Sequence, residues 1–113
     1  MFCALIVPTI IFSANIYSRK TGNWTDNSAT GTWSTASLGG AACSCVPSST
    51  DNVIIGGSNT ITYDVASATT INALQVNVSS KLTITASRIL TINTSVTLNG
   101  TIDGAGTKNI EYA

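Results

Sequence analysis

Residues 74–98 read LQVNVSSKLTITASRILTINTSVTL, and this stretch decides the fold. Leucine recurs in it every eight residues, at Leu74, Leu82, Leu90 and Leu98. After each of the first three leucines come a polar residue and then a branched apolar one, namely Gln75-Val76, Thr83-Ile84 and Thr91-Ile92. Alternation with a period of two is typical of a half-buried β-strand. The stretch therefore predicts short strands that begin at regular intervals, separated by small polar residues.

A step of about eight residues holds one strand of about four or five residues and one short corner. Three steps would make a coil of about 24 residues, and the parallel strands of successive coils would stack about 4.8 Å apart. Nothing between Val53 and Thr107 has the period or length of a helix, which excludes a doubly wound fold. We therefore expect an all-β protein, a β-solenoid, in which Leu98 lies over Leu74.

The apolar members of the repeat are expected to point inward and form the core. They are Leu74, Val76, Leu82, Ile84, Leu90 and Ile92. The eight-residue step also relates the strand around Val53 to the one around Ile61, but the phase slips near Ile71. A corner or a bulge is predicted at that slip. A second change of register is predicted near Gly100, where the spacing of apolar residues shifts again.

The composition restricts the classes of function. The chain has 113 residues, enough for one modest domain, of which 9% are charged, and its formal net charge is zero. Nucleic acid is not an expected partner, because phosphate binding needs a basic patch. His is absent, which removes the usual general base and the commonest metal ligand. We expect no cofactor and no metal site, and the abundance of Ser, Thr and Asn favours a secreted or surface-exposed β protein.

The sequence divides into three parts. Residues 1–14 are almost wholly apolar, too short for a membrane span, and are interpreted as a signal peptide, with a hydrophobic first strand as the alternative. Residues 15–50 are rich in Gly and hydroxyl side chains and are expected to form an N-terminal cap over the open end of the solenoid. Residues 51–113 are expected to form about two coils. This is fewer than solenoids usually need, so the sequence reads as the start of a longer protein.

The cap segment contains both tryptophans and two of the three cysteines. Trp24 and Trp33 are expected to pack the short irregular strands of the cap, and stacking on a sugar ring is the alternative role for their indoles. Cys43 and Cys45 form a Cys-x-Cys pair, which is half of a zinc site, but the chain cannot complete the four ligands convincingly. A disulfide between them is possible, though strained, and would suit an oxidising compartment.

Several motifs together carry a resemblance to a known group of proteins. They are Gly22-Asn23-Trp24-Thr25-Asp26, Thr32-Trp33-Ser34, Asp51-Asn52-Val53-Ile54-Ile55, the leucine repeat and Gly100-Thr101-Ile102. This order resembles the N-terminal region of large secreted proteins of the Bacteroidota, which are adhesin-like or carbohydrate-active, and the part from Val53 to Tyr63 is similar to the opening of a G8-type domain. The resemblance implies a right-handed parallel β-helix at the cell surface or outside the cell. It transfers no catalytic residue to this chain.

Three functions remain open. The first is a non-enzymatic structural or adhesive module whose partner is a surface polysaccharide or another cell-surface protein. The second is part of a polysaccharide lyase or hydrolase, although the five acidic residues form no close pair and catalysis within these residues is not expected. The third is ice binding by an outward polar face that includes Thr60, Thr62, Thr83, Thr85 and Thr91.

Overall fold

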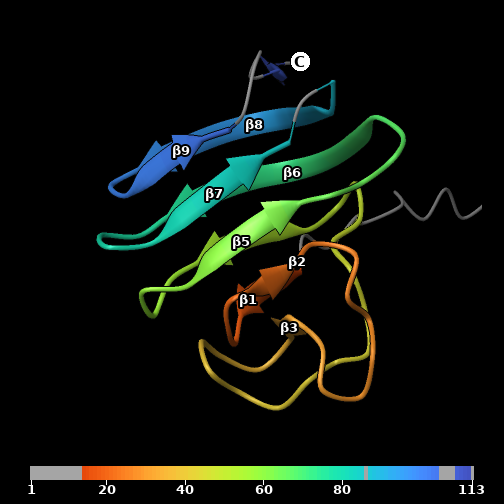
Figure 1. The fold of residues 1–113 in the computed structure, drawn as a ribbon, viewed down its shortest axis with the longest axis vertical. Coiled ribbons are helices and arrows are strands. Elements are labelled where there is room, and N and C mark those ends of the chain that lie inside the picture. The colour runs from red at the N-terminus through yellow and green to blue at the C-terminus, as the bar shows by residue number, and fades with distance from the viewer. Residues whose placement is uncertain (1–13, 86, 105–108, 113) are drawn as a thin grey trace, which may run out of the picture.

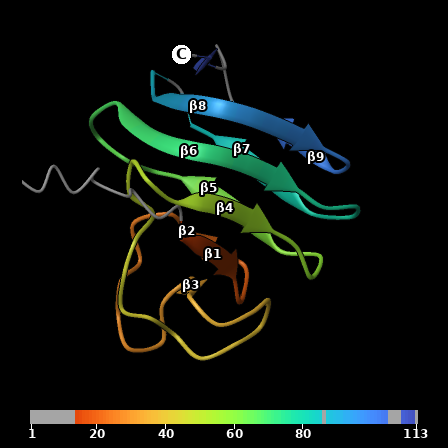
Figure 2. The ribbon, with the colours of Figure 1, turned by 180° about the vertical axis from the view of Figure 1, so that it is seen from behind.

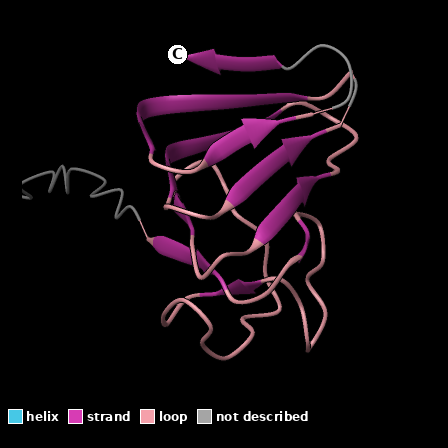
Figure 3. Cartoon of the chain, turned by 60° about the vertical axis from the view of Figure 1, so that its left-hand side comes forward, coloured by secondary structure: helices cyan, strands magenta, loops and turns pink. Residues whose placement is uncertain are grey.

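The computed structural model describes residues 14–85, 87–104 and 109–112, and this part of the chain is all β, with no helix (Figures 1 and 3). The predicted signal peptide lies almost wholly outside the described residues. The strands are β1 (Asn15–Ser18), β2 (Gly22–Asn23), β3 (Trp33–Ser34), β4 (Asn52–Ile55), β5 (Thr60–Tyr63), β6 (Thr69–Val76), β7 (Lys81–Ile84), β8 (Ile89–Leu98), β9 (Thr101–Asp103) and β10 (Asn109–Tyr112).

The strands form two sheets that face each other. Sheet A has the order β10-β8-β6-β4-β1-β3, and sheet B has the order β2-β5-β7-β9. All pairings are parallel except the antiparallel one between β1 and β3. From β4 to β10 the chain passes back and forth between the sheets, so that β5, β7 and β9 rise along one face and β4, β6 and β8 along the other (Figures 1 and 2).

The two long strands of sheet A, β6 and β8, each pair with two neighbouring strands. Strand β4 pairs with the second half of β6, from Ala73 to Val76, whereas β10 pairs with the first half of β8, from Ile89 to Ile92. The pairing of β6 with β8 shifts register between Ile71 and Ala73. Sheet A therefore has an irregularity at the position where the sequence predicted a corner or a bulge, and that prediction is confirmed.

One passage of the chain through both sheets takes fewer than the roughly 24 residues that three eight-residue steps predicted. Val53 lies opposite Leu74, which corresponds to 21 residues, and Leu74 lies opposite Val96, which corresponds to 22. The expectation that Leu98 lies over Leu74 is therefore wrong. Leu98 pairs with Val76 instead and is 51% exposed. The reason is that the bend within β8 is shorter than a full corner, so Val96 reaches the position over Leu74.

The predicted register change near Gly100 is present. Val76 pairs with Leu98, at an offset of 22 residues, but Lys81 pairs with Thr101, at an offset of 20. The corner between β8 and β9 is thus two residues shorter than the corner below it. It fits because Gly100 lies against the backbone carbonyl oxygens of that lower corner, where a side chain would collide.

The core lies between the two sheets and is continuous along their length. All six residues predicted to point inward are at most 1% exposed, which confirms that prediction. They belong to one cluster with Ile16, Trp24 and Trp33 from the N-terminal segment. Burial of each such aliphatic side chain contributes roughly 1.5–3 kcal/mol, so the cap segment and the stacked strands are stabilised together.

The N-terminal segment is joined to the stacked strands by hydrogen bonds as well as by packing. β1 pairs with β4, and β2 pairs with β5. The buried hydroxyl of Ser18 donates to the carbonyl oxygen of Gly56 (3.1 Å) and accepts from the Gly56 N–H (3.0 Å) and the Asn59 amide (3.1 Å). Arg19 donates from Nε to the carbonyl oxygen of Gly40 (2.9 Å) and from Nη1 to that of Gly31 (2.8 Å). The Ser18 contacts fix the segment against the corner that contains Gly56 and Asn59, and the Arg19 contacts hold the loops of the segment together.

Candidate functional site

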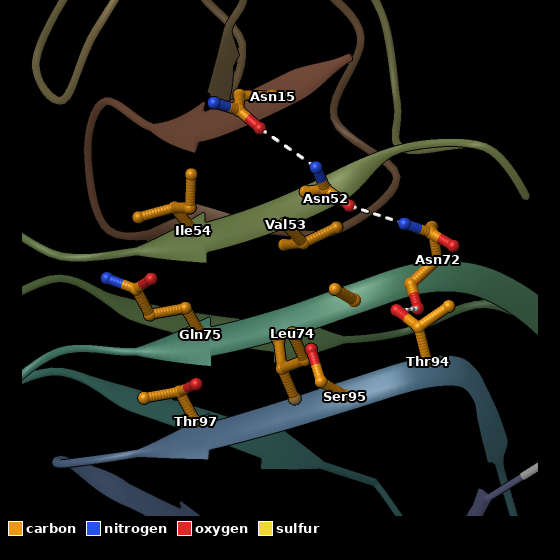
Figure 4. Close-up of a pocket in the computed structure, with 11 residues that line it drawn as sticks. Asn15, Asn52, Val53, Ile54, Asn72, Leu74, Gln75, Thr94, Ser95 and Thr97 are labelled. Carbon is orange, nitrogen blue, oxygen red and sulfur yellow. Dashed lines mark hydrogen bonds between the residues drawn. The ribbon is translucent and has the colours of Figure 1, made fainter. Parts of the chain in front are cut away.

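The candidate site is a groove of about 360 Å³ on the outer face of sheet A (Figure 4). It crosses β1, β4, β6 and β8 at the bend in sheet A. Its lining is Asn15, Asn52, Val53, Ile54, Asn72, Ala73, Leu74, Gln75, Thr94, Ser95 and Thr97. Side chains from four successive strands therefore contribute to one surface feature, although the strands come from distant parts of the sequence.

The groove exists because short side chains occupy the middle of this face. Ala73 pairs with Asn52 on one side and with Ser95 on the other. The two small residues Ala73 and Ser95 are therefore neighbours across the sheet. The next outward row contains Ile54, Gln75 and Thr97, which are larger. Figure 4 shows Ile54, Gln75 and Thr97 along one side and Asn72 and Thr94 along the other. The depression between these walls is thus a consequence of side-chain size.

A ladder of asparagines leads into the wall of the groove that contains Asn72 and Thr94. The Asn52 amide donates to Oδ1 of Asn15 (3.0 Å), and the Asn72 amide donates to Oδ1 of Asn52 (2.7 Å). The Thr94 hydroxyl continues the series by donating to the carbonyl oxygen of Asn72 (2.8 Å). Because each bond joins neighbouring strands, the ladder fixes the orientation of the amides and also ties the strands together.

The groove is electrically neutral. Its lining contains amides, hydroxyls and aliphatic groups but no Asp, Glu, Lys or Arg. Charge in the described part of the chain lies elsewhere, as in the ion pair between Lys81 and Asp103 on the outer face of sheet B (3.2 Å). The groove can therefore offer hydrogen bonds in both directions, but it cannot compensate the charge of an ionic ligand.

The described aspartates are held in structural hydrogen bonds and do not meet at one place. Asp51, which is 7% exposed, accepts from the backbone N–H and the hydroxyl of Ser48 (2.7 and 2.9 Å). Asp64 accepts from the N–H and hydroxyl of Thr25 (3.0 and 2.7 Å). Within residues 14–85, 87–104 and 109–112, no group of three or more His, Cys, Asp or Glu side chains is placed to hold a metal ion.

Asp26 is an aspartate whose environment lowers its pKa. Hydrogen bonds from the side chain and the backbone N–H of Ser28 hold the pKa of Asp26 below its ordinary value. The bond from the Ser28 N–H to the carboxylate is 3.1 Å long, and the Lys20 ammonium lies 3.9 Å from the same carboxyl group. This carboxylate therefore organises its own loop, which is a structural role.

Both tryptophans lie in the core, which corrects the alternative that their indoles stack on sugar. Trp24 and Trp33 are each 1% exposed, and their rings meet edge to face at 5.1 Å between centroids. Tyr63 packs edge to face on Trp24 at the same distance. The indole nitrogen of Trp33 donates to the carbonyl oxygen of Trp24 (2.8 Å). Protein therefore covers the ring faces that a sugar would need.

The threonines proposed as an outward polar face are half-buried and do not form a uniform array. Thr62 and Thr83 lie side by side on sheet B, but the next position in their row is Asp103. Lys81 follows Thr60 in the neighbouring row. The Thr85 hydroxyl donates to the carbonyl oxygen of Tyr63 and accepts from Arg88, whereas Thr91 lies on sheet A. The ion pair of Lys81 with Asp103 thus interrupts this face.

The two cysteines of the cap segment, Cys43 and Cys45, are joined in a disulfide. Both are half-buried and pack against the core cluster, below the Trp33 strand. The backbone N–H of Cys43 donates to the carbonyl oxygen of Trp33 (3.0 Å). The bond therefore closes the tight turn at Ser44, which has a positive φ of 52°.

The groove was not foreseen from the sequence. Its asparagines are 37 and 20 residues apart, so no regular spacing marks them. The sequence does contain a signal for two of them. Asn15 and Asn52 each directly precede a branched apolar residue at the start of a strand, Ile16 and Val53, and these two residues pair with each other. Once the strand pairing is known, that shared position places them side by side.

Comparisons with known proteins give no relative. No protein family model matches the chain, and neither the curated proteins nor the solved structures include a significant match. In the described part of the chain, no helix is long and apolar enough to cross a membrane. The described strands and their pairing define an all-β protein built mainly from parallel strands.

Proposed function

We propose that the chain is a non-enzymatic structural and adhesive module of a secreted or cell-surface protein. In this proposal residues 15–50 form the N-terminal cap of a right-handed parallel β-helix, and residues 51–113 form its first coils. The partner is a surface polysaccharide or another cell-surface protein. The same proposal takes residues 1–14 to be a signal peptide.

One observation carries the proposal: the core runs without a break from the cap tryptophans into the parallel stacked strands. Such an arrangement is rigid along its axis, because each strand is hydrogen-bonded to the strands above and below. A rigid axial body with polar outer faces suits a stalk or a binding surface. The aspartates support a non-catalytic role, since those described are engaged with serine, threonine or lysine side chains.

The resemblance to secreted proteins of the Bacteroidota stays a prediction from the motifs, because the comparisons found no relative. A β-helix lyase or hydrolase and an ice-binding protein are the alternatives. Neither is favoured by a specific contact: the acidic residues do not converge, and an ion pair interrupts the threonine face.

The test is to incubate the purified full chain with a panel of insoluble polysaccharides and with whole bacterial cells, and to measure the bound fraction and reducing-sugar release. Binding without sugar release supports an adhesive module. Sugar release would replace the proposal with the enzymatic alternative, and thermal hysteresis of the solution would replace it with ice binding. Failure to bind any polysaccharide or cell surface would remove the adhesive role. A crystal structure of the chain would decide the handedness of the coils.

A further inference from the structure

We infer that the groove on the outer face of sheet A binds an uncharged polysaccharide chain lying across strands β1, β4, β6 and β8. The inference deepens the proposed adhesive function and rests on it. It assigns a site and a class of ligand: a neutral glycan, held by amides and hydroxyls along the groove floor and walls.

The chemistry of the lining matches that of a neutral sugar. A sugar hydroxyl both donates and accepts, and the amides of Asn15, Asn52 and Gln75 present both kinds of group. Ser95 and Thr97 add hydroxyls, and both are exposed. Each hydrogen bond to a neutral partner contributes modestly, about 0.5–1.5 kcal/mol, so several contacts along a polymer are needed. An extended groove supplies them.

The ladder orients the Asn52 amide before a ligand arrives. One N–H of Asn52 donates to Asn15, and its oxygen accepts from Asn72. An amide nitrogen carries two N–H groups and its oxygen has two lone pairs, so Asn52 retains one donor and one acceptor site beyond the ladder. Because the ladder has already fixed this side chain, binding costs less conformational entropy than it would for a mobile side chain.

An apolar surface lies at the end of the groove, where the C–H face of a sugar ring could pack. Ile54 lines the groove, and Tyr17 is its direct partner on β1. Both are half-buried, and the Tyr17 hydroxyl accepts a hydrogen bond from the Asn15 amide (3.3 Å). An aromatic ring beside polar groups is a typical sugar-binding arrangement, since the ring covers C–H groups while the amides meet the hydroxyls.

The spacing of the strands favours a polymer over a single sugar. Equivalent positions on neighbouring parallel strands are about 4.8 Å apart, so a groove that crosses four strands is longer than one sugar ring. Successive sugar units of one chain would therefore contact different strands of the sheet. Other ligand classes fit less well. The lining has no cationic group for a phosphate or a uronic acid, and no carboxylate for a metal ion.

The experiment compares three variants of the full chain by affinity electrophoresis in gels that contain a neutral glucan, mannan or galactan, or an acidic pectin. Ala73→Leu fills the groove floor without removing a ladder hydrogen bond. Thr62→Leu adds similar apolar bulk on the outer face of sheet B and serves as the matched control. Gln75→Ala removes one exposed amide from the groove wall. The melting temperature of each variant is measured beside the binding.

We expect the parent chain and Thr62→Leu to be retarded equally by at least one neutral polysaccharide. Ala73→Leu should weaken that binding by about tenfold or more, which corresponds to about 1.4 kcal/mol, and Gln75→Ala by a smaller factor. If Ala73→Leu does not fold, the comparison of Gln75→Ala with Thr62→Leu decides.

Three results separate this inference from the proposed function. Binding to neutral polysaccharide that both groove variants leave unchanged would overturn the groove and keep the adhesive role. Retardation by the acidic pectin alone would overturn the ligand class. Absence of retardation in every gel would overturn the inference, while adhesion to whole cells in the earlier assay would still support the proposed function.

Discussion

Replacement of Ser18 by alanine tests how much one buried hydroxyl contributes to the attachment of the N-terminal segment to the stacked strands. Ser18 is 0% exposed, and its hydroxyl makes three hydrogen bonds with the corner that contains Gly56 and Asn59. Ser18→Ala removes all three without a large change in volume. We expect the chain to fold and to be less stable.

The magnitude follows from which partners find a substitute. The carbonyl oxygen of Gly56 also accepts from the backbone N–H of Asn59 (3.2 Å), so it keeps a hydrogen bond. The Asn59 side chain is half-buried and can turn to water. The Gly56 N–H is buried and donates its hydrogen bond to the Ser18 hydroxyl, so the Ser18→Ala substitution removes its acceptor. A buried group that loses its partner costs about 1–3 kcal/mol, so we expect a destabilisation of about 2 kcal/mol.

Urea unfolding followed by tryptophan fluorescence measures this loss. Trp24 and Trp33 are both buried, so their emission reports the unfolding of the segment and of the shared core. With an ordinary dependence on urea of about 1–2 kcal/mol per molar, the midpoint should fall by about 1–2 M. Ser37→Ala, at an exposed position of the same segment, is the control and should leave the midpoint unchanged. A midpoint for Ser18→Ala equal to that of the control would refute the reasoning.

Three further perturbations follow from the packing. Leu82→Ala, at a fully buried position, should cost about 2–5 kcal/mol, whereas Leu98→Ala, at a half-exposed one, should cost far less; equal urea midpoints would contradict the assignment of the core. Gly100→Ala should lower the melting temperature by several degrees, because the added methyl group meets two backbone carbonyl oxygens, and an unchanged melting temperature would argue against that close approach. Burial raises the pKa of Tyr63 above its ordinary value of 10.0. The neutral Tyr63 side chain therefore contributes its full stability below pH 10, and this contribution is lost as the pH rises through the raised pKa. The melting temperatures of the parent and of Tyr63→Phe should converge above pH 10. A difference between them that does not change with pH would contradict this.

The sequence alone determined the all-β class and the identity of the core, whereas β6 and β8, with 8 and 10 residues, are longer than the strands of about four or five residues that it predicted. The period of two and the regular restart at Leu74, Leu82 and Leu90 are local properties, and a residue that alternates with polar neighbours on a short strand has one buried side. For the same reason, the slip near Ile71 and the shift near Gly100 could be located from the spacing of apolar residues. Composition alone also favoured neutral polar surfaces, since so few residues are charged.

The tertiary structure decided what lies beside what. The length of each turn depends on how tightly a corner or bend packs, and this placed Val96 over Leu74, although the sequence favoured Leu98. Burial of the Trp24 ring depends on contacts with distant strands. The groove required parallel pairing of β1, β4, β6 and β8, because its amides are brought together by register and share no spacing in the sequence. Contacts of this kind are set by the packing of the whole sheet, which local residue patterns do not contain.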